Sequence, residues 1–247
     1  MTKKKKIILS IVAVVLALAT YGYFFGVQTV CAVSARIMRQ PQQDIVPKPM
    51  ALDSYSAPVT DLKTFDYNFS VPWSNCSQIT GITSLVVWAC SESNFQVACL
   101  SPSVGVYSAL IPEPSSEDAE YRQAMIEFME LRNILYTNFH ICKKVWEVTP
   151  EDISLFDSKR AAMSKSFLLV LKTIGFPSGI RESYFFEHGD IKGFQFGNLS
   201  VDSSIQLSIF DQMDRELRLS VSVSTNSPVR LTQADINTII TTFSSKP

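Results

Sequence analysis

Residues 205–223, with the sequence IQLSIFDQMDRELRLSVSV, decide the fold of this chain. Apolar and polar side chains alternate at 205–209 and again at 217–223, on either side of a polar centre. Because successive side chains of a strand point to opposite faces, this pattern predicts two strands with one dry face and one polar face. One-sided burial of this kind is typical of an antiparallel meander.

The sequence on either side extends the same architecture. Residues 181–187 and 191–199 flank His188-Gly189-Asp190, which predicts a hairpin closed by a tight turn. Downstream, Thr232 can cap a helix, with Asp235 three residues on. The apolar stripe of that helix comprises Ile236, Ile239, Ile240 and Phe243. We expect this stripe to pack on the dry face of the sheet.

Three earlier segments also alternate, at 65–71, 84–90 and 95–101. The last two predict a hairpin that turns near Glu92-Ser93. In its expected register Cys90 faces Phe95, Trp88 faces Val97 and Val86 faces Cys99.

Five cysteines occur, at positions 31, 76, 90, 99 and 142, without a C-x-x-C pair. In the expected register Cys90 and Cys99 share a face but lie about 13 Å apart, too far for a disulfide. We therefore interpret these two as small buried apolar residues. The remaining candidates for a bridge are Cys76 and Cys142.

A helical hairpin is predicted between the two groups of strands. Its first helix begins near Ser115 and carries an apolar stripe at Tyr121, Ala124, Phe128, Leu131, Leu135 and Phe139. After a linker at 143–148, the second begins at Thr149-Pro150-Glu151-Asp152 and ends at Gly175, with a break expected near Asp157-Ser158. Its expected core stripe comprises Ile153, Phe156, Met163, Phe167, Val170, Leu171 and Ile174.

The N-terminal region predicts a membrane anchor. Residues 7–27, IILSIVAVVLALATYGYFFGV, carry no charge and are long enough to cross a bilayer. The preceding Lys3-Lys4-Lys5-Lys6 favours a cytoplasmic N-terminus and an extracytoplasmic C-terminal domain. The alternative is a cleaved signal peptide, whose apolar region is usually about 7–15 residues long.

Gly22 and Gly26 have the G-x-x-x-G spacing that lets two membrane helices approach closely. One hypothesis is therefore a homodimer formed through these two glycines. The favoured alternative is that their spacing arose by chance.

The chain thus divides into a basic tail (1–6), a transmembrane signal anchor (7–27), a Pro-rich stalk (28–60) and an extracytoplasmic domain (61–247). For that domain we predict an α+β fold, with an antiparallel sheet packed against helices. The alternative is that the helical hairpin and the sheet form separate domains.

The charge argues against a nucleic-acid partner. Four of the 22 Lys and Arg residues precede the anchor, so 18 remain against 23 Asp and Glu residues, a net charge of −5. Phosphate binding needs a basic surface.

Only one group of residues suggests chemistry. Glu187, His188 and Asp190 could bind a metal or move a proton. A tight turn that contains Gly189 explains the same residues. This is the favoured interpretation, since a metal site needs three or four convergent ligands. The common hydrolase and nucleotide-binding motifs do not occur.

We therefore assign no cofactor, metal or catalytic residue. The leading hypothesis is a non-catalytic domain that binds or scaffolds an unidentified protein of the cell envelope. The alternative is an anchored hydrolase or small-ligand-binding domain, with its site on the polar face of the sheet or near His188.

Overall fold

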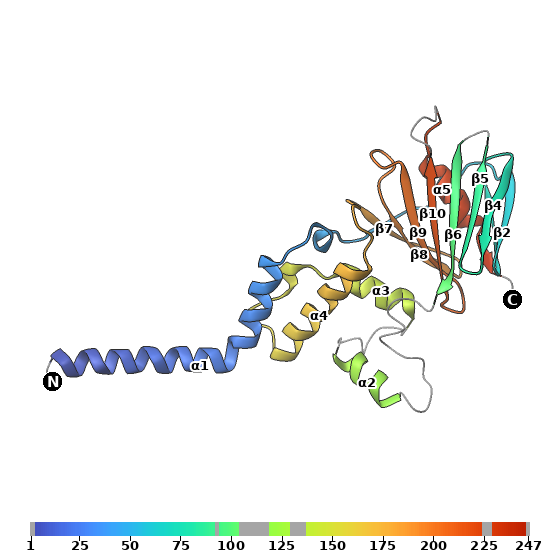
Figure 1. The fold of residues 1–247 in the computed structure, drawn as a ribbon. Coiled ribbons are helices and arrows are strands. Elements are labelled where there is room, and N and C mark those ends of the chain that lie inside the picture. The colour runs from blue at the N-terminus through green and yellow to red at the C-terminus, as the bar shows by residue number, and fades with distance from the viewer. Residues whose placement is uncertain (1–2, 92–93, 104–118, 129–136, 224–228, 246–247) are drawn as a thin grey trace.

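The computed structural model describes residues 3–91, 94–103, 119–128, 137–223 and 229–245 (Figure 1). It confirms the α+β fold class, with an eight-stranded sheet, a three-stranded sheet, several helices and one apolar N-terminal helix. Figure 1 shows the helices α1, α3 and α4 on one side of the large sheet and α5 on the other.

The large sheet runs in the order β1-β7-β8-β9-β10-β6-β5-β4. Its strands are β1 (Lys48–Pro49), β4 (Cys76–Ile82), β5 (Leu85–Cys90), β6 (Phe95–Ser103), β7 (Ser183–His188), β8 (Ile191–Phe196), β9 (Ser204–Phe210) and β10 (Glu216–Val223). Neighbours are antiparallel except for the short β1, which runs parallel to β7. The small sheet consists of β2 (Thr60–Thr64), β3 (Tyr67–Val71) and β11 (Ser244–Ser245).

The helical elements are α1 (Lys3–Ile37), α2 (Ala119–Phe128), α3 (Asn138–Glu147), α4 (Lys159–Gly175) and α5 (Gln233–Thr242). Two short 3-10 turns, η1 (Pro41–Asp44) and η2 (Pro150–Asp152), precede β1 and α4.

The predicted meander is confirmed. Leu217, Leu219 and Val221 of β10 lie opposite Ile209, Leu207 and Ile205 of β9, and all six side chains are buried. The β5–β6 hairpin has the expected register, with Cys90 opposite Phe95 and Val86 opposite Cys99. The strands β2 and β4 were not predicted.

The dry face of the large sheet is covered as expected. Thr232 caps α5 in a capping box with Asp235, and the predicted stripe of Ile236, Ile239, Ile240 and Phe243 is buried. The small sheet closes the same core, where the Phe243 ring lies 5.1 Å from the Tyr67 ring, centroid to centroid.

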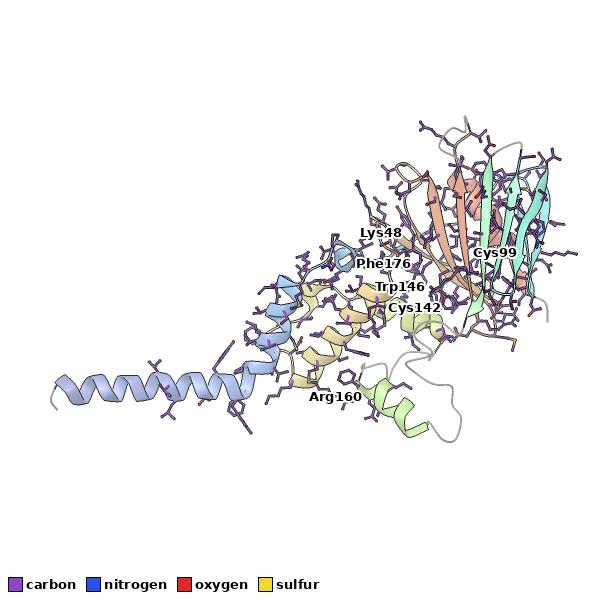
Figure 2. The ribbon with its side chains drawn as sticks, in the orientation of Figure 1. Lys48, Cys99, Cys142, Trp146, Arg160 and Phe176 are labelled. Atoms are coloured by element: carbon purple, nitrogen blue, oxygen red, sulfur yellow. A yellow bond between two sulfur atoms is a disulfide. The ribbon has the colours of Figure 1, made fainter. Side chains whose placement is uncertain are left out.

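The opposite face of the sheet is only partly covered, by an aromatic cluster under α3 and α4. Phe194 of β8 is fully buried, with its ring centroid 4.1 Å from Trp146 and 5.0 Å from Phe139, both on α3. Phe196 and Phe176 complete the contact. Figure 2 shows Trp146 and Phe176 between the helices and the sheet.

The helices between the two groups of strands differ from the prediction. A separate helix, α3, begins after Thr137, whose side chain accepts a hydrogen bond from the His140 backbone N–H. Because α3 continues to Glu147, residues 143–147 are helical and not the predicted linker. His140 lies in the first turn of this helix. The expected cap at Ser115, and Leu131 and Leu135, lie outside the described residues.

The second predicted helix is confirmed in its break and in its end, but it starts at Lys159 instead of Thr149, and its buried face is only partly the predicted one. Thr149 and Asp152 form a capping box around η2, the chain breaks as expected, and α4 runs from the Ser158 cap to Gly175. Ile153 and Leu171 are buried as predicted, but Phe156, Met163, Val170 and Ile174 are exposed. Leu168 and Lys172, which were not in the predicted stripe, are buried instead. The helical period was correct, but the segments of the chain that pack against α4 bury a face that differs in part from the predicted one.

Residues 28–60 were expected to form an extended stalk, but part of this stretch is helical and packed against the rest of the chain. The helix α1 continues to Ile37, and Gln28, Ala32 and Ala35 are buried beside α4. Further on, β1 pairs with β7, and the Ser56 side chain donates to Asp235 at 2.8 Å. The division of the chain into domains stays a prediction.

The apolar side chains of α1 whose burial is described before Val27 are exposed, among them Val14, Val15, Leu16 and Tyr23. Residues 14–37 are long and apolar enough to cross a membrane by length and composition. Figure 1 shows α1 changing direction between its projecting part and the turns beside α4. A Cβ added at Gly22 or Gly26 would meet no atom within 4 Å, and the homodimer suggested by these glycines stays a prediction.

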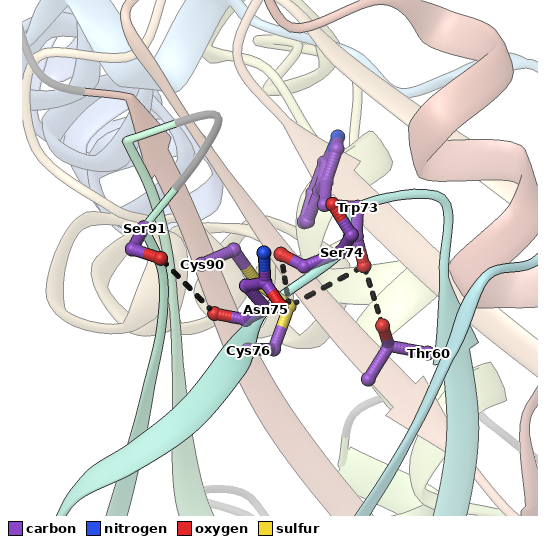
Figure 3. The surroundings of a disulfide bond; sticks show 7 residues. All are labelled: Thr60, Trp73, Ser74, Asn75, Cys76, Cys90 and Ser91. Carbon is purple, nitrogen blue, oxygen red and sulfur yellow. Dashed lines mark hydrogen bonds between the residues drawn. A yellow bond between two sulfur atoms is a disulfide. The ribbon is translucent and has the colours of Figure 1, made fainter.

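The predicted Cys76–Cys142 disulfide is wrong. Cys76 is bonded to Cys90, and Cys142 is a free, buried thiol on α3 (Figure 3). The error arose from the unpredicted strand β4, whose first residue Cys76 lies directly opposite Cys90. Cys99 is buried and free, as expected.

Removing this disulfide is expected to destabilise the domain. A bridge that closes a loop of about 15 residues contributes about 3 kcal/mol by limiting the unfolded chain, and the two cysteines are 14 positions apart. We expect the double variant Cys76→Ser/Cys90→Ser to lose about this much in urea unfolding of the detergent-solubilised protein. Reductant should shift the wild-type midpoint and leave that of the double variant unchanged; an unshifted wild type would contradict the bond.

Candidate binding groove on the polar sheet face

A groove of about 240 Å³ lies where α3 and the end of α4 meet the polar face of the central strands. The strands β5, β6, β9 and β10 form its floor, and Trp146 and Phe196 rise beside it. Its lining is Leu85, Ala98, Leu100, Trp146, Gly175, Pro177, Phe196, Gln206, Leu207, Ser208, Glu216, Arg218, Leu219 and Ser220.

The polar centre of the floor is a three-residue network. Glu216 and Arg218 are two positions apart on β10, so their side chains share one face. The Arg218 Nε and Nη2 atoms donate to the two Glu216 carboxylate oxygens at 2.9 and 3.2 Å. Ser208, on the neighbouring strand β9, donates its hydroxyl to Glu216 Oε1.

Burial differs sharply within this network. The Glu216 side chain is 2% exposed, whereas that of Arg218 is 39% exposed. A buried carboxylate is costly unless it is paired and hydrogen-bonded, and Glu216 is both. The guanidinium thus neutralises a buried charge on one side and reaches the open groove on the other.

A β-bulge shapes the floor beside this pair. Between Arg218 and Glu216, β10 advances by two residues while the facing stretch of β6 advances by three, from Leu100 to Ser103. Pro102 lies in this stretch and has no N–H for the ladder, which explains why pairing is irregular there. Bulges bend a strand locally and re-aim its side chains.

Hydrophobic side chains form the walls. Trp146 is held edge-on against Phe194 and Phe196, with interplanar angles of 79° and 81°. Leu100, from β6, lines the groove and is half exposed. A groove with apolar walls and a few placed polar groups is typical of a ligand site.

The free thiol of Cys142 lies close enough to Glu216 and Arg218 for their charges to affect its pKa. Burial raises its pKa well above the usual value, and the nearby charge of Glu216 acts in the same direction. The thiol is therefore neutral at physiological pH, which makes it a packing residue rather than a nucleophile.

The arrangement is suited to binding rather than to catalysis. The Ser208 hydroxyl donates to a carboxylate that is already paired with a guanidinium, so this carboxylate is poorly placed to act as a general base. Neither histidine lines the groove: His140 is on the first turn of α3, and His188 is at the end of β7.

The residues predicted near His188 form the expected turn. Gly189 has φ of +57°, and Gly189-Asp190 joins β7 to β8, with His188 opposite Ile191. The three side chains diverge: His188 is exposed, Glu187 lies 3.7 Å from Lys192 Nζ, and Asp190 accepts from Gln212 Nε2 at 2.8 Å. The turn thus accounts for all three residues.

The β9–β10 turn beside it has a structural role. Asp214, with φ of +60°, accepts from the backbone N–H groups of Asn138 and Phe139 at the start of α3. Nearby, Asp211 accepts from the Tyr67 hydroxyl and from Arg215. These carboxylates join α3 and the small sheet to the large sheet.

One feature of the groove could be predicted from the sequence, namely the polar face of the alternating strands. Gln206, Ser208, Arg218 and Ser220 were predicted to share that face, and all four line the groove. Glu216 was outside the predicted strand, and Trp146 was in the predicted linker. Their convergence depends on the bulge and on the position of α3.

Within the described ranges, no group of three or more His, Cys, Asp or Glu side chains could hold a metal ion. Comparisons of the chain with protein-family models, with curated proteins and with solved structures found no match.

Proposed function

We propose that the chain is a single-pass membrane protein whose extracytoplasmic domain binds a partner protein without catalysis, through the groove on the polar face of the sheet. The observation that carries this proposal is the groove itself, with its apolar walls and its Ser208–Glu216–Arg218 floor.

The membrane position rests on α1. Its projecting part is apolar, follows four lysines and presents Val14, Val15 and Leu16 outward. A helix of this length with exposed aliphatic side chains is suited to a lipid environment. The basic N-terminus favours a cytoplasmic tail, which would place the folded domain outside.

The groove chemistry defines what the partner should present. Leu100 offers exposed apolar surface beside the edges of the nearly buried Trp146 and Phe196, and the partly exposed Arg218 places a positive charge in the same lining. An apolar side chain beside a carboxylate or carbonyl oxygen would use both features.

A small molecule with the same chemistry is the second candidate. It is favoured by the mixture of apolar wall and few polar groups, which small-ligand sites share.

Site-specific photo-crosslinking tests the groove as the binding site. A benzophenone amino acid is placed at Leu100, and in a matched control at Ile79 on the edge strand β4, in full-length protein in its native membrane. Both positions are about half exposed, and only Leu100 lines the groove. We expect a discrete protein adduct from position 100 that a groove-filling Ala98→Trp substitution abolishes.

The other outcomes are also informative. Loss of the adduct together with a small molecule retained in native mass spectrometry would replace the first candidate with the second. Equal adducts from positions 100 and 79, or an adduct insensitive to Ala98→Trp, would overturn the groove as the site.

A further inference from the structure

We propose that the turn between η2 and α4, residues 154–159, is a second membrane contact that rests Leu155 and Phe156 on the outer leaflet beside the emerging α1. This inference rests on the proposed membrane position of α1 and adds a lipid-binding surface to the folded domain.

The contact between α4 and α1 places this turn at the membrane surface. Lys159 Nζ, on the first turn of α4, lies 5.0 Å from the centroid of the Tyr23 ring. Tyr23 is within the uncharged stretch 7–27, about 6 Å along the helix axis before Val27. The start of α4 is therefore level with the outer end of the predicted span.

The chain reaches this depth by extending away from the body of the domain. At Ile153 it is still beside the far end of α1, where Arg36 Nη2 donates to the Ile153 carbonyl at 3.4 Å. Residues 154–158 then connect Ile153 to the start of α4, where Ser158 is the cap and Lys159 lies by Tyr23. Figure 1 shows this end of α4 beside the change of direction in α1.

The tip of the turn is apolar. Phe156 is 91% exposed, the highest value among the exposed large hydrophobic residues of the described chain, and the adjacent Leu155 is 42% exposed. Phe156 and Lys159 are three positions apart, so their Cα atoms lie within about 11 Å of each other. Aromatic side chains at this level are typical of the membrane interface.

Basic side chains follow the tip on its C-terminal side, and Arg160 lies 3.7 Å from Glu127. Lys159 and Arg160 follow directly in sequence and are both exposed, and Figure 2 shows Arg160 at this end of α4. Lys165, one turn and a half further along α4, donates to Asp157 at 2.9 Å and holds the turn in shape. An apolar tip flanked by Lys and Arg matches the amphipathic chemistry of a lipid headgroup surface.

The test uses tryptophan as a depth probe in the full-length protein. Phe156→Trp, its neighbour Leu155→Trp and the matched control Ile79→Trp are reconstituted into vesicles of phosphatidylcholine and phosphatidylglycerol. Part of the phosphatidylcholine carries bromine near the start of its acyl chains, and wild-type emission from Trp73, Trp88 and Trp146 is subtracted. We expect roughly half of the added emission at 156 to be quenched, because interfacial aromatics lie about 5–10 Å into the headgroup boundary. Emission added at 79 should be unaffected.

A carbonate wash of the same vesicles separates the two proposals. Protein that is removed by the wash would overturn the membrane position of α1 and this inference with it. Protein that stays in the membrane while emission at both 155 and 156 is quenched no more than at 79 would overturn the lipid contact alone.

Discussion

Replacing Phe194 with alanine is expected to lower the free energy of unfolding by about 3–5 kcal/mol, since a buried phenylalanine loses both its transfer energy and its packing. Phe194 is fully buried between the sheet and α3, with ring centroids 4.1 Å from Trp146, 5.0 Å from Phe139 and 6.3 Å from Phe210. The substitution therefore removes the centre of the contact that attaches the helices to the polar face.

Urea unfolding of the detergent-solubilised protein measures this effect, with Phe156→Ala as the matched control. Phe156 is almost fully exposed, so the same chemical change there should alter stability by less than about 0.5 kcal/mol in detergent. Equal losses at both positions would show that the aromatic cluster does not hold the helices on the sheet.

The second large effect is a rise in stability with pH that depends on Lys172. This side chain is fully buried on α4, and its ammonium group donates to the carbonyl oxygens of Gln43 at 3.0 Å and Val148 at 2.8 Å. Burial lowers its pKa from 10.5 to about 8, although Asp44 and Asp152 act in the opposite direction.

Stability rises with pH because the folded state releases the Lys172 proton at a lower pH than the unfolded state does. Below pH 8 the folded and unfolded states both hold the proton, and the charged form is costly only in the folded state. Between about pH 8 and 10.5 the unfolded chain still holds a proton that the folded state has released, so stability rises with pH. The gain approaches about 3 kcal/mol, at about 1.4 kcal/mol per unit of pKa difference.

Lys172→Met should remove this rise while keeping most of the side-chain volume. The measurement is the difference in unfolding free energy between wild type and variant, from pH 7 to pH 10. The pKa of Tyr184 is raised to about 12, mainly by its hydrogen bond to Glu182. The titration of Tyr184 affects the wild type and the variant equally, so it cancels in the difference between their unfolding free energies. The exposed Lys63→Met is the matched control and should keep the wild-type pH profile. A Lys172→Met profile that still rises like the wild type would contradict the assignment.

Only part of the groove could be predicted from the sequence. The alternation at 205–209 and 217–223 places Ser208 and Arg218 on one face, because strand geometry alone separates odd from even positions. It does not place Trp146 above them, since the position of α3 depends on contacts between segments far apart in the chain. Those contacts include Asp214, which caps α3 from the β9–β10 turn.

What the sequence by itself determined is local: the strand alternation, the Thr232 cap, the break near Asp157-Ser158, the end of α4 at Gly175 and the apolar stretch of α1. Each depends on residues within a few positions of one another, so its physical cause is contained in a short window. Only the tertiary structure decided which partner each element meets. Cys76 pairs with Cys90 because β4 joins the sheet edge beside β5. Lys172 is buried while Ile174 is exposed because residues 43 and 148 bring carbonyl oxygens to one face of α4. Such choices depend on long-range packing, which periodicity in the sequence does not record.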